Sequence, residues 1–174
     1  YDARRIQVLK AVPNAAHFAL AELEKHFDVV IITQNIDDLH ERSGSTNVLH
    51  LHGEILKGRS VKNDANLYDI SENIKLGDLA PDGHQMRPHI VWFGEDVPMI
   101  ETAMEICQTA DILLIVGTSM QVYPAAGLIN FAPKKTPIYF IDPNPAISSA
   151  DNITVITETA TKGLKRFMDL SQSN

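Results

Sequence analysis

Residues 111–119, DILLIVGTS, give the clearest indication of the architecture. The stretch runs through five consecutive aliphatic residues and then ends in a glycine and two hydroxyl residues. An uninterrupted aliphatic run of this length is typical of a parallel strand that is covered on both faces. Helical patterns at 98–110 and 123–131 flank it, so the strand is expected to belong to alternating strand and helix units.

The same alternation extends through the rest of the chain. Apolar runs of strand length and helical patterns follow one another at 1–12 (helix), 14–27 (helix), 28–33 (strand), 47–53 (strand), 136–142 (strand), 152–157 (strand) and 162–170 (helix). Strands that alternate with helices predict a Rossmann-like α/β fold built on a doubly wound parallel sheet.

One segment interrupts the pattern. Residues 54–85 are polar and show little periodicity, and RPHIVWFGEDVP (87–98) follows them with a short apolar strand. We therefore expect one Rossmann-like domain formed by 1–53 and 87–174, with a small insertion module at 54–86.

Composition excludes several classes of protein. The 174 residues are 44% hydrophobic and 21% charged, as in ordinary globular domains. A net charge of −7 argues against binding to nucleic acid. No apolar run is long enough for a membrane span and the first residues lack a signal-peptide core, so we expect a cytoplasmic protein without membrane contact. The single Cys107 allows neither an internal disulfide nor a thiolate-rich zinc site, and packing within a helix is its expected role.

Polar residues gather where the predicted strands end. Ligands of open α/β sheets bind beyond the carboxyl ends of the strands. The residues at these ends are Gln34, Asn35 and Asp37, then Gly117, Thr118 and Ser119, and finally Asp142. Gly-Thr-Ser after a strand is more often a turn than a ligand site, and an Asp before Pro143 is also a common turn residue.

His50 and His52 lie two residues apart in the predicted strand at 47–53. They allow three interpretations: a metal pair, a satisfied structural pair, or one general base. A metal site is the weakest of these, because the nearby polar segment adds only His84 and His89 as further ligands. Gly53 favours a base at His52, since a glycine lets a substrate approach the ring closely.

Taken together and in order, these motifs resemble the sirtuin family of NAD-dependent protein lysine deacylases. The resemblance covers nearly all of the chain outside 54–85, and the motifs that carry it are TQNIDDLHERSG, LHG, RPHIVWFGE, VGTSMQVYPAAGL and IDPNP.

The resemblance implies NAD as a co-substrate and an acyl-lysine protein or peptide as the other substrate. His52 would be the general base, accepting a proton from a ribose hydroxyl, and the products would be free lysine, nicotinamide and O-acyl-ADP-ribose. The implied NAD-binding residues are Gln34, Asn35 and Asp37 at the nicotinamide side, and Gly117, Thr118, Ser119, Asp142 and Ala160 elsewhere. The implied acyl-lysine channel is formed by Val91, Trp92, Phe93 and Gly94, whose backbone would pair with the peptide as an added strand.

The chain departs from the family pattern at three places, and the first two are losses. The family's Gly-Ala-Gly block, which follows its first strand and wraps the pyrophosphate, is absent, so we expect a truncated chain that lacks a central strand. This loss could abolish turnover. Residues 54–85 contain none of the four cysteines that hold the structural zinc of most sirtuins, so we expect a module without zinc.

Tyr1 and Arg4 resemble the Tyr-x-x-Arg pair of sirtuins that remove acidic acyl groups such as succinyl and malonyl. The phenol and the guanidinium would together bind the distal carboxylate. The simpler interpretation is a helix end with a solvated arginine.

Two other functions stay open from the sequence. One is a non-catalytic module that binds NAD or ADP-ribose, and the other is a sirtuin-like ADP-ribosyltransferase. A base aimed at the ribose favours catalytic ancestry, since binding alone would not require His52.

Overall fold

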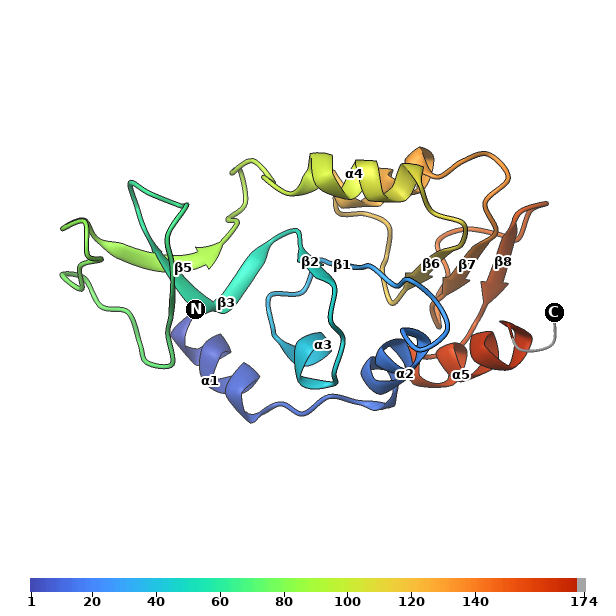
Figure 1. Cartoon of the computed structure of the whole chain (residues 1–174), viewed down its shortest axis with the longest axis horizontal. Helices are drawn as coiled ribbons and strands as arrows, with labels where there is room; N and C mark the ends of the chain where they lie inside the picture. The colour runs from blue at the N-terminus through green and yellow to red at the C-terminus, as the bar shows by residue number, and fades with distance from the viewer. Residues whose placement is uncertain (172–174) are drawn as a thin grey trace.

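The parallel α/β fold predicted from the aliphatic runs is confirmed by the computed structural model, which describes residues 1–171 (Figure 1). The helices are α1 (Asp2–Lys10), α2 (Ala15–Leu23), α3 (Leu39–Arg42), α4 (Ile100–Gln108), the 3-10 helix η1 (Ala125–Phe131) and α5 (Ala160–Ser171). The strands are β1 (Ile31–Thr33), β2 (Val48–His50), β3 (Gly53–Ser60), β4 (Leu67–Asp69), β5 (Met86–Ile90), β6 (Leu113–Val116), β7 (Ile138–Ile141) and β8 (Ile153–Ile156).

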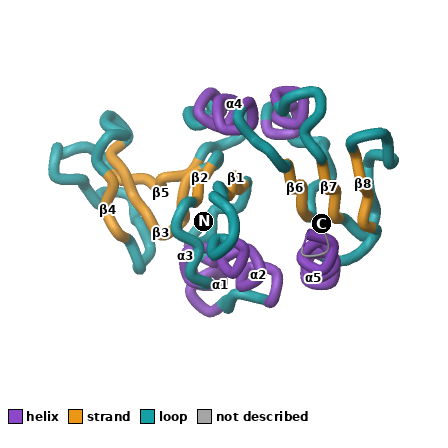
Figure 2. Tube along the Cα trace, turned by 45° about the vertical axis from the view of Figure 1, so that its right-hand side comes forward, coloured by secondary structure: helices purple, strands orange, loops and turns teal. Residues whose placement is uncertain are grey.

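The parallel strands are divided between two hydrogen-bonded sheets. One sheet pairs β1 with β2, and the other has the order β6-β7-β8. β1 and β6 are therefore both edge strands, and Figure 2 shows them set apart. Apolar runs indicate where strands are but not which strands exchange hydrogen bonds, so this division into two sheets is seen only in the structure.

Helices cover the strands from both sides (Figures 1 and 2). On one side, α4 and η1 contribute a buried cluster that includes Ala103 and Leu128 and is completed by Ile32 of β1 and Leu113 of β6. On the other side, α2 and α5 pack against β7 and β8 through the buried Leu164 and its neighbours. One helical layer thus rests on both parallel sheets.

A third sheet is antiparallel and has the order β4-β3-β5. It is seated on α1 through a small core of Val8, Ile55 and Ile90. Arg5 of α1 is fully buried and donates from Nε to the Ile55 carbonyl oxygen at 3.0 Å. The segment 54–85, which looked irregular in sequence, therefore contains most of a regular sheet.

The strand predicted at 87–98 is shorter in the structure and belongs to this antiparallel sheet. β5 ends at Ile90, and a turn follows in which the Glu95 N–H donates to the Trp92 carbonyl oxygen at 2.9 Å. Gly94 has a φ of +89°, which breaks the extended backbone. Among the described residues, no helix has the length and apolar character needed to cross a membrane.

Candidate active site

His52 lies in the turn between β2 and β3, with one ring nitrogen bonded and the other free. Nδ1 is 3.0 Å from the carbonyl oxygen of Gln34. A carbonyl oxygen only accepts, so Nδ1 carries the hydrogen and the lone pair of the neutral ring is on Nε2. No hydrogen bond within residues 1–171 uses Nε2. His52 is therefore set up to accept a proton at Nε2.

His50 is bonded at both ring nitrogens. Nε2 lies 2.7 Å from a carboxylate oxygen of Glu41, and Nδ1 lies 3.3 Å from the Asn35 carbonyl oxygen. Its ring thus braces the segment after β1 and offers no free nitrogen to a ligand. Of the three interpretations of this pair, the geometry favours a structural His50 and a basic His52.

Gly53 is required for a different reason from the one expected from the sequence. Its φ is +77°, and a Cβ at this position would lie 2.1 Å from the His89 carbonyl oxygen. The glycine therefore allows β3 to approach β5, because the space where a Cβ would stand is occupied by the backbone of β5. This approach also lets the Val91 N–H donate to the His52 carbonyl oxygen at 3.0 Å, which places the segment after β5 beside the candidate base.

The polar segment after β1 leaves side chains available to a ligand. The backbone is fixed by local bonds, since the Asn35 N–H donates to the Thr33 hydroxyl and Asp37 accepts from the Leu39 N–H at 3.2 Å. Asn35 is exposed, and its side-chain amide makes no hydrogen bond in the described part of the chain. An amide of this kind can both donate to and accept from a bound ligand.

The segment Val91–Gly94 presents aromatic surface next to α1. Trp92 is 41% exposed and Phe93 is fully exposed. The Tyr1 ring stacks on Trp92 with centroids 6.3 Å apart and an interplanar angle of 6°. The N-cap residue of α1 therefore contacts the predicted acyl-lysine channel.

A second group of candidate residues lies at the ends of β6 and β7. Gly117 has a φ of +62° and open space where a Cβ would stand, and its N–H donates to the Ile141 carbonyl oxygen at 2.9 Å. Asp142 accepts from the Asn144 N–H at 2.7 Å, which is the turn geometry considered as its alternative role. Ala160 begins α5. No hydrogen bond or ring contact in residues 1–171 connects this group with His52.

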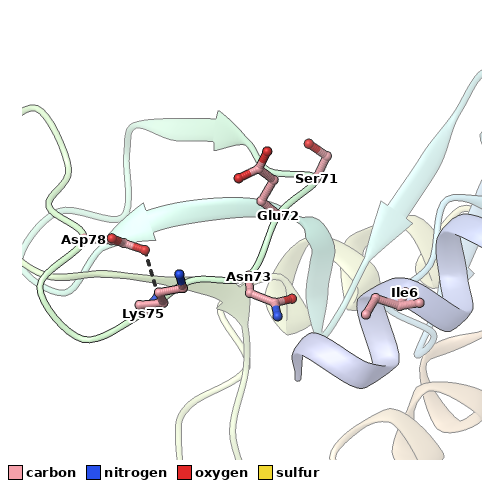
Figure 3. A pocket seen from close by; sticks show the side chains of 6 residues that line it. All are labelled: Ile6, Ser71, Glu72, Asn73, Lys75 and Asp78. Atoms are coloured by element: carbon pink, nitrogen blue, oxygen red, sulfur yellow. Dashed lines mark hydrogen bonds between the residues drawn. The ribbon is translucent and has the colours of Figure 1, made fainter.

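A hollow of about 500 Å³ lies elsewhere, between α1 and the segment that precedes β5 (Figure 3). None of the predicted site residues lines it; its lining is Ile6, Ser71, Glu72, Asn73, Lys75 and Asp78. Within the described residues, no group of three or more His, Cys, Asp or Glu side chains is arranged to hold a metal ion.

Two residues that the sequence analysis did not single out organise the Trp92 segment. Arg87 and Glu95 form a bidentate ion pair, with nitrogen–oxygen distances of 2.7 and 3.0 Å. They flank VWFG in the sequence, but only the turn after β5 brings them together.

Comparison with known proteins gives one consistent result. The model of the Sir2 family matches residues 1–124. A protein of Bacteroides thetaiotaomicron named NAD-dependent protein deacylase is 48% identical over 177 residues, which cover 98% of this chain and 76% of that protein. A Helicobacter pylori protein of the same name is 50% identical over 169 residues, covering 97% and 74%.

Solved structures agree with the sequence comparison. A Sir2 homologue in complex with NAD superposes with a TM-score of 0.84 at 33% identity, over 99% of this chain and 70% of the other. A Sir2 protein bound to a propionylated peptide gives a TM-score of 0.79 at 30% identity, over 97% and 75%.

Proposed function

Because the chain belongs to the Sir2 family, we propose that it removes acyl groups from protein lysines with consumption of NAD, using His52 as the general base. The observation that carries the assignment of the base is the bonding of the His52 ring, with Nδ1 engaged by the Gln34 carbonyl and Nε2 free. Relatives that are about half identical, and of which this chain covers 76% and 74%, carry the name NAD-dependent protein deacylase, which supports the reaction class.

The residues present fit NAD as the co-substrate. The unbonded amide of Asn35 matches the hydrogen-bonding pattern of a carboxamide or a ribose hydroxyl, and the open space over Gly117 allows close approach to the end of β6. Bound NAD supplies a ribose carbon from which nicotinamide departs. We assign the nicotinamide side to Gln34, Asn35 and Asp37, and the remainder to Gly117, Thr118, Ser119, Asp142 and Ala160.

The chain's own groups divide the remaining tasks. His52 accepts a proton at Nε2 from a ribose hydroxyl, which makes that oxygen nucleophilic. The Gln34 carbonyl holds the imidazole in the required tautomer. The backbone of Val91–Gly94 aligns the acyl-lysine peptide as an added strand, and its link to the His52 carbonyl keeps the peptide close to the base.

The test is detection of nicotinamide release by chromatography, with an acyl-lysine peptide and NAD. We expect release only when both are present, together with O-acyl-ADP-ribose. ADP-ribose attached to the protein or peptide would indicate an ADP-ribosyltransferase, and NAD binding without release would indicate a non-catalytic module.

We further propose a preference for acidic acyl groups. Tyr1 is stacked on Trp92, and Arg4 is exposed one helical turn further along α1, on the same face as Tyr1. The guanidinium can bind a carboxylate through two hydrogen bonds and the phenol can add a third. Such a pairing is worth about 2–3 kcal/mol, so succinyl-lysine should be preferred over acetyl-lysine by about 30- to 100-fold in kcat/KM.

Arg4→Met tests the acyl preference, with Lys10→Met at the far end of α1 as the matched control. Arg4→Met should remove most of the preference and leave turnover of acetyl-lysine unchanged, because only the acidic substrate loses a partner. Equal loss on both substrates would show that Arg4 only supports the helix.

We also propose that the antiparallel sheet needs no zinc and that the protein acts in the cytoplasm. The sheet is supported by the Ile55 core and by Arg5, which bonds to the carbonyl oxygens of Ile55 and Glu72. Cys107 is a buried free thiol, as is common in reducing compartments. Stoichiometric zinc that survives dialysis against a chelator would contradict the first proposal and return His84 and His89 to consideration.

A further inference from the structure

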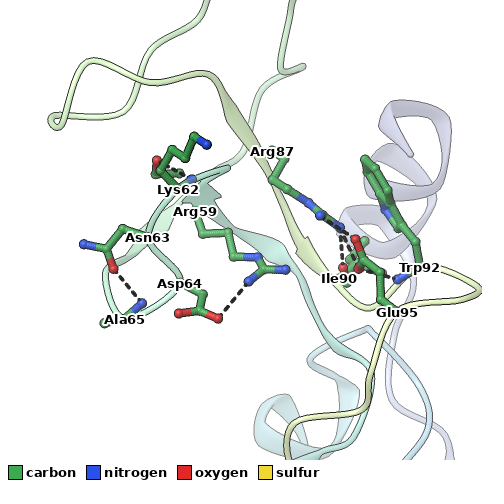
Figure 4. A network of polar contacts seen from close by, with 10 residues as sticks. Arg59, Lys62, Asn63, Asp64, Ala65, Arg87, Ile90, Trp92 and Glu95 are labelled. Atoms are coloured by element: carbon green, nitrogen blue, oxygen red, sulfur yellow. Dashed lines mark hydrogen bonds and ion pairs between the residues drawn. The ribbon is translucent and has the colours of Figure 1, made fainter.

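Arg87 binds Ile90, the last residue of β5, and contacts Trp92 and Glu95 among the five residues that follow β5. These residues, 91–95, are called the clamp loop below. Nη1 and Nη2 of the guanidinium each donate to one carboxylate oxygen of Glu95. Nη2 also donates to the Ile90 carbonyl oxygen at 3.0 Å. Its central carbon also lies 3.7 Å from the centroid of the Trp92 ring. Figure 4 shows the guanidinium between Ile90, Trp92 and Glu95.

These contacts close the clamp loop on itself. Besides its bonds to Arg87, the Glu95 carboxylate accepts from the Trp92 N–H at 2.9 Å, and the Glu95 N–H donates to the Trp92 carbonyl oxygen. The loop is thus held at its tryptophan and at its last residue, and the same guanidinium binds the strand residue that precedes it. The hydrogen bonds from Arg87 and Trp92 lower the pKa of Glu95 to about 2, so the carboxylate stays ionised throughout the pH range in which the protein would work.

The closed loop leaves its middle open to a partner. Within residues 1–171, no hydrogen bond uses the backbone N–H of Phe93 or of Gly94. The Phe93 side chain is fully exposed. An extended peptide can pair only with backbone groups that are free and held in a fixed direction. The clamp loop meets both conditions, and Arg87 supplies the second.

We propose that Arg87 is a positioning residue that holds the clamp loop in the shape that receives the acyl-lysine peptide. The inference rests on the proposed function, because the peptide is the substrate of that reaction. Arg87 acts through Glu95 and Trp92 and does not itself touch the reacting atoms. Lysine cannot replace it, since an ammonium lacks both the planar fork that matches a carboxylate and the flat face that lies on an indole.

The chain offers a closely matched control in Arg59. It lies opposite Arg87 in the β3–β5 pairing and is similarly shielded, with side-chain exposures of 18% for Arg59 and 15% for Arg87. Its ion pair, however, is with Asp64, at 3.3 Å, and it has no bond to the clamp loop (Figure 4). Arg59→Lys and Arg87→Lys therefore make the same chemical change in the same sheet.

Trp92 makes the test direct, because it is the only tryptophan of the chain. In Arg87→Lys without ligand, we expect red-shifted emission and stronger acrylamide quenching. The KM and the Kd for a labelled acyl-lysine peptide should rise about tenfold, whereas kcat and the KM for NAD stay within about twofold. Arg59→Lys should resemble the wild type in every measurement. Glu95→Gln should change the peptide KM in the same direction, and it replaces Arg87→Lys if that variant does not fold.

Two outcomes would overturn the positioning role. One is a peptide Kd that stays within about twofold of the wild type although Trp92 emission shows a loosened loop. The other is an equal loss in Arg59→Lys, which would mean that the sheet as a whole is sensitive to the change. Fluorescence anisotropy of the labelled peptide measures binding without turnover, so it tests the positioning role even if the wild type releases no nicotinamide. Peptide binding without nicotinamide release would refute the proposed function alone. A wild type that fails to bind the peptide refutes both.

Discussion

His50 and His52 are two residues apart, yet their rings are bonded in different ways. His50 is held between Glu41 and the Asn35 carbonyl, whereas His52 is held at one nitrogen only. A ring with both nitrogens engaged can stabilise a fold, but a general base needs a free lone pair. The proposed division of roles follows from these contacts and not from the type of residue.

Replacement of His52 by Ala should abolish deacylation and leave the fold intact. A positioned base contributes about 10²- to 10⁴-fold to the rate, and no other imidazole is expected to reach the ribose. The measurement is nicotinamide release from NAD in the presence of an acyl-lysine peptide, with circular dichroism to confirm folding.

His50→Ala is the control for this experiment. It should reduce stability, because it removes the contacts to Glu41 and Asn35, while part of the activity persists. An inactive His50→Ala beside a His52→Ala variant with near-normal turnover would reverse the assignment.

Single residues differ in how far they could be predicted. The strand-end residues and His52 stand in contiguous motifs, so their positions in the sequence are sufficient to propose them. Arg87 and Glu95 form their pair across a turn whose geometry depends on Gly94. No spacing rule for helices or strands covers such a pair, so it becomes apparent only in the folded structure.

Among the elements, the contact between α2 and α3 is expected to respond to pH. The rings of His17 and His40 lie 4.9 Å apart. Burial lowers the pKa of both histidines, and the neighbouring His17 and His50 lower the pKa of His40 further. Asp37 acts to raise the pKa of both and Glu41 that of His40, but the net shift of both is downward. Protonation therefore costs more in the folded chain than in the unfolded chain, which binds more protons as the pH falls below 6.5.

The melting temperature should consequently fall between pH 7.5 and pH 5.5. The pKa values of His17 and His40 are lower in the folded chain than in the unfolded chain. Their neutral rings therefore contribute fully to stability at a pH above the unfolded-state pKa, and this contribution is lost as the pH falls toward the folded-state pKa. Calorimetry of the wild type and of His40→Gln, with exposed His26→Gln as control, measures the effect. If the melting temperature of His40→Gln fell with pH as steeply as that of the wild type, the pH dependence would belong to other groups. One such group is His89, because burial lowers its pKa as well.

The contact between α5 and β7 depends on a glycine. A Cβ at Gly163 would lie 2.2 Å from Cγ2 of Ile141, and Ile141 is fully buried and has no space to move. Overpacking of this kind costs about 1–3 kcal/mol, and it outweighs the gain of about 1 kcal/mol in helix propensity for Ala over Gly. Gly163→Ala should therefore lower the free energy of unfolding, as measured by urea titration.

Lys162→Ala is the control at an exposed position of the same helix. The side chain at this position is exposed, so the change should be nearly neutral. A Gly163→Ala variant as stable as Lys162→Ala would mean that α5 can move away from β7 at little cost.

Elements were predicted best where the buried face is aliphatic. The runs that became β6, β7 and β8 lie within the predicted ranges. β3 was missed because its buried positions are Gly53, Ile55, Gly58 and Ser60, which show no hydrophobic periodicity, and because the pairing with β5 shifts register between Glu54 and Gly58. A strand that packs through glycines does not have the sequence pattern of a strand.

At the scale of the molecule, the two parallel sheets present edges that are not paired with each other. The N–H groups of Leu113 and Gly117 donate to the carbonyl oxygens of Pro137, which precedes β7, and of Ile141, which ends it. Those of Leu114 and Val116 therefore point away from β7. All four residues of β6 are only partly buried, although helices lie on both sides of the strand. An aliphatic edge of this kind favours association between chains.

Hydrogen exchange should show this directly. The amides of Leu114 and Val116 should exchange at least about tenfold faster than those of β7, which is paired on both sides. Size-exclusion chromatography of the same sample should show association that increases with concentration. A monomer in which the β6 edge is as well protected as β7 would contradict the prediction.

The antiparallel sheet joins the rest of the molecule at neighbouring points. The chain enters it at Gly53 and leaves it at Ile90, and these two residues are paired. Because the chain enters and leaves at adjacent residues, the segment between them can be exchanged for another whose two ends lie at the same spacing. The antiparallel sheet of a relative should thus be accepted in a single swap from Gly53 to Ile90 that leaves the clamp loop in place, on the condition that the incoming piece carries an arginine at the position of Arg87.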